Sequence, residues 1–396
     1  MNFDPPESVK PLLARIAAFV TDHVMPAEAE MFERGFHAAT PRIDELRARV
    51  KREGMWGPQI PKELGGLGLG LLEHGLVSEQ LGKSPLGHYV FGCQAPDAGN
   101  LEVLHKYGTR EQQKSWLEPL AKGEIRSCFS MTEPENPGSN PTMLSCTARK
   151  DGEHYVIDGH KWFTSSADGA SFAIVMAVTN PDAAPHGRAS MIIVPTDAPG
   201  FERVRNIKIM GDAGEGWASH AEIRYHGVRV PVANRLGPEG SGFLIAQERL
   251  GPGRIHHCMR WIGTCERVFD TMCRHITHRK ISDDKTLAMT QTAQTWVAEA
   301  RAEIDSARLM VLHAAWTLDQ KGFHAARDQV SLIKFYVAGV MMRVIDRAIQ
   351  LHGALGVTSD TVLSYYYVHE RGSRIYDGPD EVHKMVVAKR ILSRYE

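Results

Sequence analysis

The sequence predicts an α+β fold in three successive parts: helices, then a β-rich segment, then long helices again. Apolar residues recur every three or four positions in the first third of the chain, which is the spacing of amphipathic helices. Near residue 125 the pattern changes to short β-branched or alternating runs separated by Gly, Pro and Asp, and from Phe243 onward helical patterns return. We therefore divide the chain into residues 1–124, 125–235 and 236–396.

The first part contains several helical patterns and one connecting loop. In ESVKPLLARIAAFVTDHVMP the apolar spacing is helical, and Pro26 stands where a helix would end. Further helices are predicted in IDELRARVKREGMWG, LLEHGLVSEQLGKS and NLEVLHKYGTREQQKSWLEPLAKGE, and the loop IPKELGGLGLG lies between them. This loop is not a dinucleotide-binding motif, because it lacks the GxGxxG spacing and does not follow a strand.

The middle part contains the predicted strands. They are RSCFSMT, MLSCTARK, HYVIDGHKWFT, SFAIVMAV, SMIIVP and AEIRYHGVRV. DGEHYVIDG has an Asp-Gly pair at both ends, which is typical of hairpin turns. Trp162 and Thr164 alternate along HKWFTSS, so both are predicted on one face of a strand. That face suits an aromatic ligand, although a half-buried Trp in a β core is a common alternative.

The last part contains two helical patterns of more than 20 residues each, QTAQTWVAEARAEIDSARLMVLHAAWTLDQKG and SLIKFYVAGVMMRVIDRAIQLHGA. Close to the C-terminus, GSRIYDGPDEVHK places Asp377 before Gly378 and Pro379. Asp-Gly and Gly-Pro pairs are ordinary turn signals, so these residues alone favour a polar turn over a carboxylate kept for chemistry.

Composition limits the classes of function. With 396 residues, 43% of them hydrophobic and 23% charged, the chain is long enough for two or three packed units. A formal net charge of −1 gives no broad electrostatic basis for binding nucleic acid or an anionic membrane. No run of about 18 apolar residues predicts a membrane span, and no signal peptide is predicted. The six scattered cysteines lack a CxxC pair, which indicates reduced and mostly buried thiols of a cytoplasmic protein.

Two further patterns bear on binding sites. CFSMTEPENPGSN is a strand that continues into a loop, where Thr132, Ser139 and backbone N–H groups can face a flat polar ligand. A simple strand and turn explains it equally well. The histidine pairs His256-His257 and His275/His278 lack a carboxylate or Cys at ligand spacing, so no metal site is expected.

Several stretches, taken in order, resemble the acyl-CoA dehydrogenase family over nearly the whole chain. They are IPKELGGLGLGLLEHGLVSEQLG, KYGTREQQKSWLEPLAKGEIRSCFSMTEP, VRVPVANRLGPEGSGF, ARLMVLHAAW and QLHGALG. MTEPENPGSN, LGPGRIHHCMRW and DGPDEVH resemble one branch in particular, whose animal members carry this unit behind a phosphotransferase-like kinase domain.

The resemblance implies FAD as cofactor and a fold with an N-terminal all-α domain, a middle β-barrel-like domain and a C-terminal four-helix bundle. It implies cofactor contacts from Phe129, Met131, Thr132, Ser139, Trp162, Thr164, Pro379 and Glu381, and contacts to the FAD of a neighbouring subunit from Arg279, Gln350 and Gly353. It also places Ser139, Arg254 and Gly378 near the acyl-CoA substrate, and it implies a homodimer or homotetramer.

The same resemblance assigns Asp377 as the catalytic base. A thioester α-proton is weakly acidic, so a base removes it while hydride leaves the β-carbon for flavin N5, and an apolar pocket strengthens such a base. The N–H of Asp377 and a flavin ribityl hydroxyl are expected to hold the thioester oxygen. Most of the family uses Glu, which is one methylene longer. Asp380 is expected on the solvent or cofactor side.

One segment departs from the family pattern. In RKISDDKTL, Ser282 and Asp283 occupy the positions of an aromatic-glycine pair, and the loop is one residue longer. Two hypotheses follow. The first is an FAD-dependent acyl-CoA dehydrogenase that passes electrons to an electron-transfer flavoprotein or a similar acceptor. The second is a flavin-poor relative that binds acyl-CoA or a protein partner without turnover. An acyl-CoA oxidase or flavin monooxygenase on the same fold is an alternative within the enzyme class.

Overall fold

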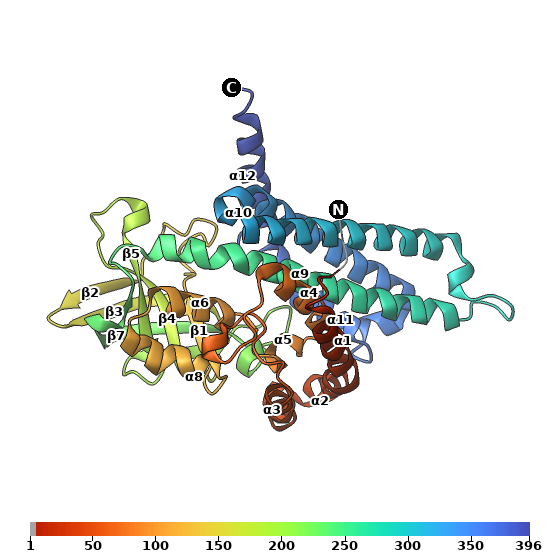
Figure 1. Ribbon diagram of the computed structural model, residues 1–396, viewed down its shortest axis with the longest axis horizontal. Helices are drawn as coiled ribbons and strands as arrows, with labels where there is room; N and C mark the ends of the chain where they lie inside the picture. The colour runs from red at the N-terminus through yellow and green to blue at the C-terminus, as the bar shows by residue number, and fades with distance from the viewer. Residues whose placement is uncertain (1–4) are drawn as a thin grey trace. The chain divides into compact units, whose positions relative to one another are not determined.

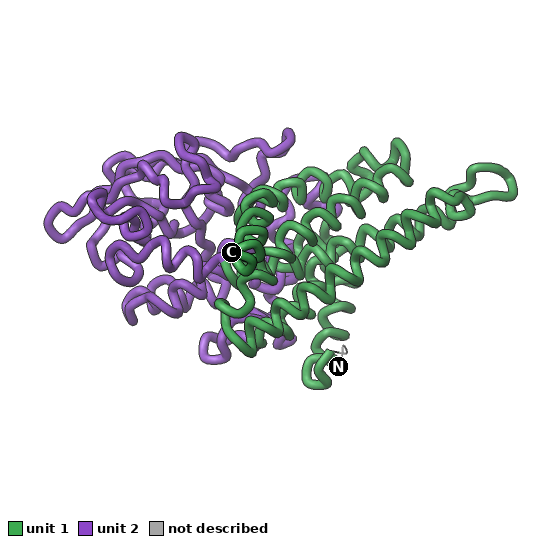
Figure 2. The backbone as a smooth tube through the Cα atoms, turned by 90° about the horizontal axis from the view of Figure 1, so that it is seen from above, with its two compact units in different colours: residues 1–28, 69–88, 251–396 green, residues 29–68, 89–250 purple. Residues whose placement is uncertain are grey.

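The computed structural model describes residues 5–396 and divides them into two compact units (Figure 2). The helical unit contains the residues up to 28, residues 69–88 and residues 251–396. The sheet unit contains residues 29–68 and 89–250. Each unit is therefore assembled from segments that are far apart in the sequence.

The N-terminal third is helical, as its periodicity predicts (Figure 1). Its helices are α1 (Lys10–Phe19), α2 (Met25–Arg34), α3 (Phe36–Arg52), α4 (Leu71–Leu81), α5 (Gly87–Val90), α6 (Asp97–Tyr107), α7 (Arg110–Gln112) and α8 (Glu118–Ala121). The side chain of Thr109 accepts a hydrogen bond from the Gln112 N–H, and the Gln112 side chain accepts from the Thr109 N–H. This capping box starts a new helix two residues after α6 ends.

The prediction that a helix ends at Pro26 is wrong. α1 continues through a π-helical turn, Val20–Val24, directly into α2, where Pro26 is the second residue. In a π-helical turn an N–H bonds five residues back, as that of Met25 does to the carbonyl of Val20. This local change of pitch makes room for a proline, which has no N–H to donate.

The C-terminal helices are α9 (Gly242–His278), α10 (Gln291–His352), α11 (Val362–Glu370) and α12 (Asp380–Leu392). Within the helical unit, α4, α11 and α12 pack against α10. Gly322 has φ 75°, a non-helical angle that divides α10 into the two long helices that the sequence predicts. Asp319 of α10 caps α4, because its carboxylate accepts the N–H groups of Leu71 (3.1 Å) and Leu72 (2.9 Å). No helix within residues 5–396 has the length and apolar character needed to cross a membrane.

The sheet unit contains eight strands. They are β1 (Ser127–Ser130), β2 (Thr147–Asp151), β3 (His154–Ser165), β4 (Phe172–Val178), β5 (Ala189–Pro195), β6 (Phe201–Asn206), β7 (His220–Pro231) and β8 (Arg235–Leu236). They pair in the order β6-β7-β3-β2-β4-β5-β8, and β1 pairs in parallel with β4. β6 is missing from the sequence prediction, because FERVRN is polar and mostly exposed at the edge of the sheet.

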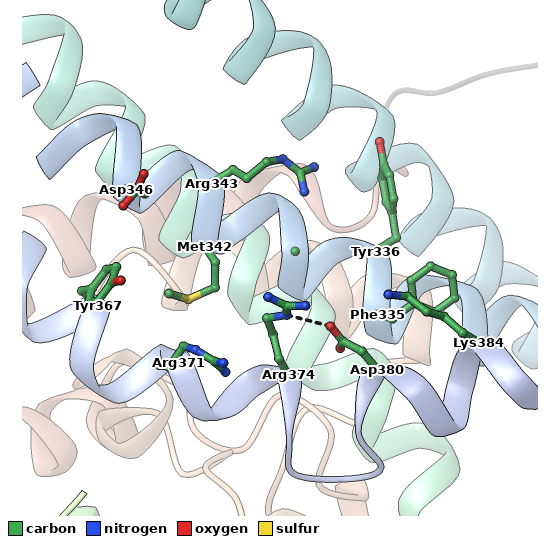
Figure 3. Close-up of a pocket in the computed structure, with 11 residues that line it drawn as sticks. Phe335, Tyr336, Met342, Arg343, Asp346, Tyr367, Arg371, Arg374, Asp380 and Lys384 are labelled. Atoms are coloured by element: carbon green, nitrogen blue, oxygen red, sulfur yellow. Dashed lines mark hydrogen bonds and ion pairs between the residues drawn. The ribbon is translucent and has the colours of Figure 1, made fainter. Parts of the chain in front are cut away.

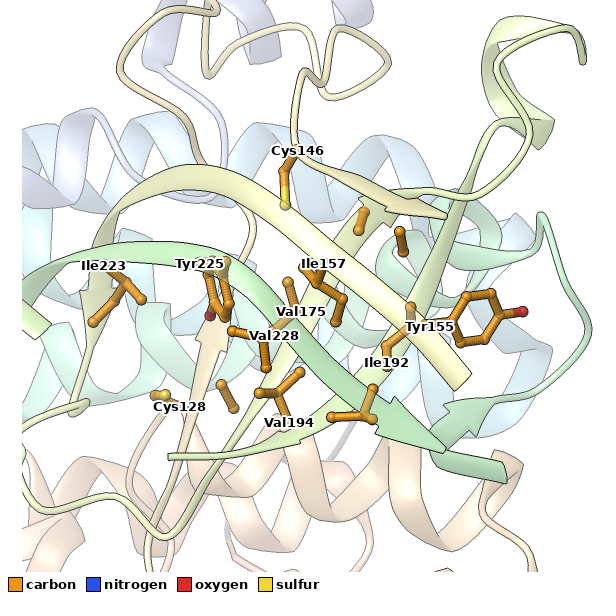
Figure 4. Packing of buried hydrophobic residues seen from close by; sticks show 14 of the residues in the cluster. Cys128, Cys146, Tyr155, Ile157, Val175, Ile192, Val194, Ile223, Tyr225 and Val228 are labelled. Carbon is orange, nitrogen blue, oxygen red and sulfur yellow. The ribbon is translucent and has the colours of Figure 1, made fainter. Parts of the chain in front are cut away.

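Both faces of the central strands are buried. Ala173, Val175 and Ala177 of β4 belong to the cluster shown in Figure 4, together with inward residues of β3, β5 and β7. The alternate residues Phe172 and Ile174 belong to a second cluster, which includes apolar residues of α6 and α8 on the other face (Figure 1). A strand covered on both faces needs apolar residues at every position, which explains the unbroken run FAIVMAV.

Only the first of the two Asp-Gly pairs in DGEHYVIDG forms a hairpin turn. Asp151-Gly152 connects β2 to β3, whereas Asp158 and Gly159 lie inside β3 at an irregularity in its pairing with β7. A Cβ on Gly159 would lie 2.5 Å from the Cβ of Cys146, so the glycine permits a close approach of two strands. The Asp158 carboxylate accepts the N–H of Gly227 at 2.7 Å.

All six cysteines are free, and five of them are buried. Burial raises the pKa of the Cys146 thiol to about 11, so this group stays protonated at neutral pH. The prediction of buried thiols therefore agrees with the fold.

Candidate active site

Asp377 lies in the turn that leads into α12, in the helical unit. Its φ of 54° is in the left-handed region, which Asp tolerates better than most residues. The next residue, Gly378, has φ 100°. A Cβ on Gly378 would lie 2.7 Å from Nε2 of His383, so the turn requires glycine at this position for two independent reasons.

The backbone of this turn is held by three side chains, one each from α9, α10 and α12. Nε of Arg254 donates to the Asp377 carbonyl oxygen at 3.0 Å, and Nε2 of His383 lies 3.2 Å from the same oxygen. Nζ of Lys334 donates to the carbonyl oxygens of Ser373 (2.7 Å) and Gly378 (3.2 Å). The conformation that places the Asp377 carboxylate is thus fixed from both sides.

Burial shifts the titration of these anchoring groups. It lowers the pKa of the His383 imidazole from its ordinary value to about 4, so this ring is neutral at pH 7 and donates as a neutral group. Burial also lowers the pKa values of Lys334 and Arg254, and the negative charge of Asp377 partly opposes both shifts. The anionic Asp377 and these cations therefore stabilise one another.

The Asp377 carboxylate itself contacts a histidine of α9. Nε2 of His257 lies 3.2 Å from Oδ2 of Asp377, and the two side chains are 20% and 21% exposed. The His257 ring stacks on Trp261, with ring centroids 5.9 Å apart and planes 20° from parallel, and it also packs against Tyr376 at 5.1 Å. Neither contact was predicted from the sequence.

A buried network supports Tyr376 and Trp261. Arg260 pairs with both carboxylate oxygens of Glu370 and donates to the Tyr376 hydroxyl at 3.2 Å. Nε1 of Trp261 donates to Oε2 of Glu370 at 3.1 Å. The aromatic rings that surround His257 are therefore anchored to one ion pair.

Asp380 was expected on the solvent or cofactor side, and the structure shows that it does not face solvent. Asp380 is only 2% exposed, and Nε of Arg374 donates to its Oδ2 at 2.7 Å (Figure 3). Both residues line a cavity of about 490 Å³ beside α10, which also contains Arg343, Arg371 and Lys384. Asp377 does not line this cavity. Glu381, the next residue, is exposed.

The other predicted flavin contacts lie in the sheet unit. Phe129 lies on β1 and Met131 and Thr132 follow it; the N–H of Trp162 donates to the carbonyl of Thr132 at 3.0 Å. The Thr164 hydroxyl lies 3.2 Å from that of Ser130. The structure therefore brings the end of β1 beside the second half of β3.

The alternation that predicts one face for Trp162 and Thr164 is interrupted. The pairing of β3 with β7 is irregular between Lys161 and Thr164, and Phe163 has φ 48°. Thr164 is fully buried, whereas Trp162 is half-buried and its Nε1 has no hydrogen-bond partner among residues 5–396. A buried donor without a partner suits a site that a ligand acceptor completes, so these residues fit a flavin.

A buried ion pair fixes the start of the predicted flavin loop. This ion pair was not predicted from the sequence. Nζ of Lys161 donates to Oε1 of Glu133 at 2.8 Å, and the two side chains are 0% and 1% exposed. The same carboxylate accepts the N–H groups of Ser145 (2.6 Å) and Cys146 (2.9 Å). These bonds close the loop at both ends, while Ser139 in its middle is exposed.

The residues predicted to reach a neighbouring subunit lie on the surface of the helical unit. Arg279, Gln350 and Gly353 are exposed, and Gly353 ends α10 with φ 61°. The loop after Arg279 folds back on itself, because Lys280 pairs with Thr286. Its acidic residues Asp283 and Asp284 are exposed.

Comparison with known proteins identifies the family. The description "Acyl-CoA dehydrogenase, N-terminal domain" matches residues 6–124, the middle domain matches residues 128–227, and the C-terminal domain matches residues 240–392. The chain therefore belongs to the acyl-CoA dehydrogenase family of FAD-dependent oxidoreductases.

Individual relatives agree with this assignment. The chain is 45% identical to the protein of Mycobacterium tuberculosis named "Probable acyl-CoA dehydrogenase FadE2", over 96% of this chain and 94% of that protein. It is 39% identical to human "Acyl-CoA dehydrogenase family member 11" over 95% of this chain, but spans only about half (49%) of that relative. This match confirms the resemblance to a branch with longer animal members.

Solved structures confirm the fold. A protein of Mycobacterium abscessus, provisionally assigned as an acyl-CoA dehydrogenase, superposes with a TM-score of 0.95 at 39% identity, with 100% of both chains covered. Butyryl-CoA dehydrogenase of Megasphaera elsdenii has a TM-score of 0.86 at 26% identity, with 99% of this chain and 100% of that chain covered.

Proposed function

We propose that this protein catalyses the α,β-dehydrogenation of an acyl-CoA thioester, with Asp377 as the base. The observation that supports this best is the turn at Asp377. A residue with φ 54° is held through its carbonyl oxygen by Arg254 and His383. Strained backbone that is fixed by several groups is typical of a functional site.

In this proposal Asp377 removes a proton from the α-carbon of the substrate as the α,β double bond forms. The anchors from Arg254, Lys334 and His383 keep the carboxylate in place, and the N–H of Asp377 donates to the thioester oxygen, where negative charge develops. FAD, when bound, would supply the acceptor for the hydride that leaves the β-carbon. Phe129, Met131, Thr132, Trp162 and Thr164 would line the flavin.

Further contacts complete the proposal. FAD would also be held by Ser139, Pro379 and Glu381. The acyl-CoA would lie near Arg254 and Gly378 and again near Ser139. In a homodimer or homotetramer, Arg279, Gln350 and Gly353 would reach the FAD of a neighbouring subunit. Their exposure on the surface supports this. An electron-transfer flavoprotein or similar acceptor would then reoxidise the flavin.

An anaerobic visible spectrum of the purified protein, recorded before and after addition of a panel of acyl-CoA thioesters, tests the proposal. We expect flavin bands that bleach with one class of acyl chain. Asp377→Asn should bleach at least a thousandfold more slowly, whereas Asp360→Asn, a change at an exposed position of the same unit, should behave as wild type. Equal bleaching in wild type and Asp377→Asn would exclude Asp377 as the base.

The same spectrum separates this proposal from the flavin-poor alternative. The exposed acids Asp283 and Asp284 lie four and five residues after Arg279, and two negative charges beside a pyrophosphate would weaken its binding. A protein that stays colourless after incubation with FAD would overturn the enzymatic proposal. Rapid reoxidation of the bleached protein by oxygen would indicate an oxidase or monooxygenase instead.

A further inference from the structure

His257 contacts the chemically reactive end of Asp377. Its Nε2 lies 3.2 Å from Oδ2 of the carboxylate, within reach of a proton shared between the two atoms. Arg254 and His383, in contrast, contact the Asp377 main-chain carbonyl oxygen. Lys334 contacts other carbonyl oxygens of the same turn. His257 is therefore placed to act on the proton that Asp377 takes up.

The position of the His257 ring is fixed by its neighbours. It packs against Trp261 (ring centroids 5.9 Å apart) and Tyr376 (5.1 Å), and both of these rings are hydrogen-bonded to the ion pair of Arg260 and Glu370. A ring that is stacked and anchored in this way keeps its Nε2 directed at one partner. This arrangement favours a defined transfer of a proton over an occasional contact.

The surrounding histidines do not compete for that proton. Burial lowers the pKa of His256 and of His383 to about 4, and it lowers the pKa of His88 well below its ordinary value. These three rings are neutral at pH 7. Burial raises the pKa of the Tyr376 hydroxyl, which therefore keeps its own proton. His257, at 20% exposed, also remains open to water.

We propose that His257 is the proton acceptor that resets Asp377 between turnovers. This inference rests on the proposed role of Asp377 as the base. The Asp377 carboxylate takes the α-proton and becomes a carboxylic acid, while the electron pair of the C–H bond stays with the substrate. The proton then passes from Oδ2 to the free electron pair on Nε2 of His257, which restores the carboxylate and forms an imidazolium. The imidazolium releases the proton to water.

The test compares two rates on an acyl-CoA deuterated at the α-carbon. One is the rate of bleaching in a single turnover, which reports removal of the deuteron. The other is the loss of deuterium from unreacted substrate into water, measured by mass spectrometry. Loss requires that the deuteron leave Asp377 before it returns to the same carbon. His257 should control this second rate and leave the first nearly unchanged.

The decisive variant is His257→Gln, since a glutamine amide can still donate a hydrogen bond to Asp377 but cannot take up a proton near neutral pH. We expect deuterium loss to slow at least tenfold relative to bleaching, with bleaching and KM within threefold of wild type. His324→Gln, at an exposed position on α10, is the matched control and should change neither rate. In His257→Ala, added imidazole should restore deuterium loss.

The outcomes separate the two proposals. If deuterium loss and bleaching fall by the same factor in His257→Gln, or if neither changes, His257 only packs against Asp377 and the relay is refuted. Failure of imidazole to restore exchange in a folded His257→Ala protein would refute it as well. If Asp377→Asn instead bleaches at the wild-type rate, the proposed base is wrong, whatever the His257 variants do.

Discussion

Gly378→Ala should weaken both the stability of the protein and its proposed reaction, for reasons that can be separated. A residue with a Cβ costs ~1–2 kcal/mol in the positive-φ region. The new Cβ would lie 2.7 Å from Nε2 of His383 and displace that ring from the Asp377 carbonyl. A lost hydrogen bond adds ~1 kcal/mol, so we expect a total of ~2–3 kcal/mol, or roughly 2–4 °C in Tm.

The effect on the reaction should be larger than the effect on stability. A shift of the Asp377 backbone by about 1 Å misplaces its carboxylate, and such misplacement can cost about a hundredfold in rate. Gly54→Ala is the matched control, since Gly54 also has a positive φ (66°) but nothing lies within 4 Å of its added Cβ. It should lose ~1 kcal/mol of stability and no activity.

Thermal unfolding and single-turnover bleaching measure the two effects. Adding His383→Ala to Gly378→Ala should recover the steric part of the lost stability, because it removes the atom that the new Cβ meets. If Gly378→Ala unfolds as Gly54→Ala does and bleaches within threefold of wild type, the turn is not the rigid support described above.

Two other predictions concern buried charges and pH. Lys161→Met should destabilise the protein by ~3–5 kcal/mol, because it leaves the buried Glu133 carboxylate without its cation. Chemical unfolding measures the loss of stability, and a loss below ~1 kcal/mol would contradict this prediction. The pKa of His383 is lowered from 6.5 to about 4 in the folded protein. Between these two pH values the unfolded chain binds a proton that the folded chain does not, so the free energy of unfolding rises with pH across this window. His383→Gln should flatten this rise by up to ~3 kcal/mol across that window; an unchanged slope in the variant would show that His383 does not cause it.

Periodicity predicts most of the fold because the core imposes it directly. β4 needs apolar residues on two buried faces, and its sequence FAIVMAV shows this. The errors arise where local geometry departs from the ideal period. Pro26 sits after a π-helical turn, and Gly159 sits where two strands approach closely. Such departures depend on partners elsewhere in the chain, so a local pattern does not reveal them.

The candidate site was predicted only in part. The resemblance points to Asp377, but the groups that hold it lie 43 positions (Lys334) and 123 positions (Arg254) away in the sequence. Some signal was present. Lys334 is a lone cation in the apolar stretch SLIKFYVAGV, and a charged residue in such a stretch usually has a buried partner. His257 has the neighbouring His256 as its only unusual sequence feature.

The discontinuous build of the helical unit has a consequence for synthesis on the ribosome. Residues up to 28 and residues 69–88 leave the ribosome long before residues 251–396, with which they form one compact unit. At 5–20 residues per second, α4 waits roughly ten seconds or more for Asp319 of α10, the residue that caps it. During that interval the apolar faces of α1 and α4 lack their final cover. α1 and α4 therefore cannot complete their packing until α10 has left the ribosome.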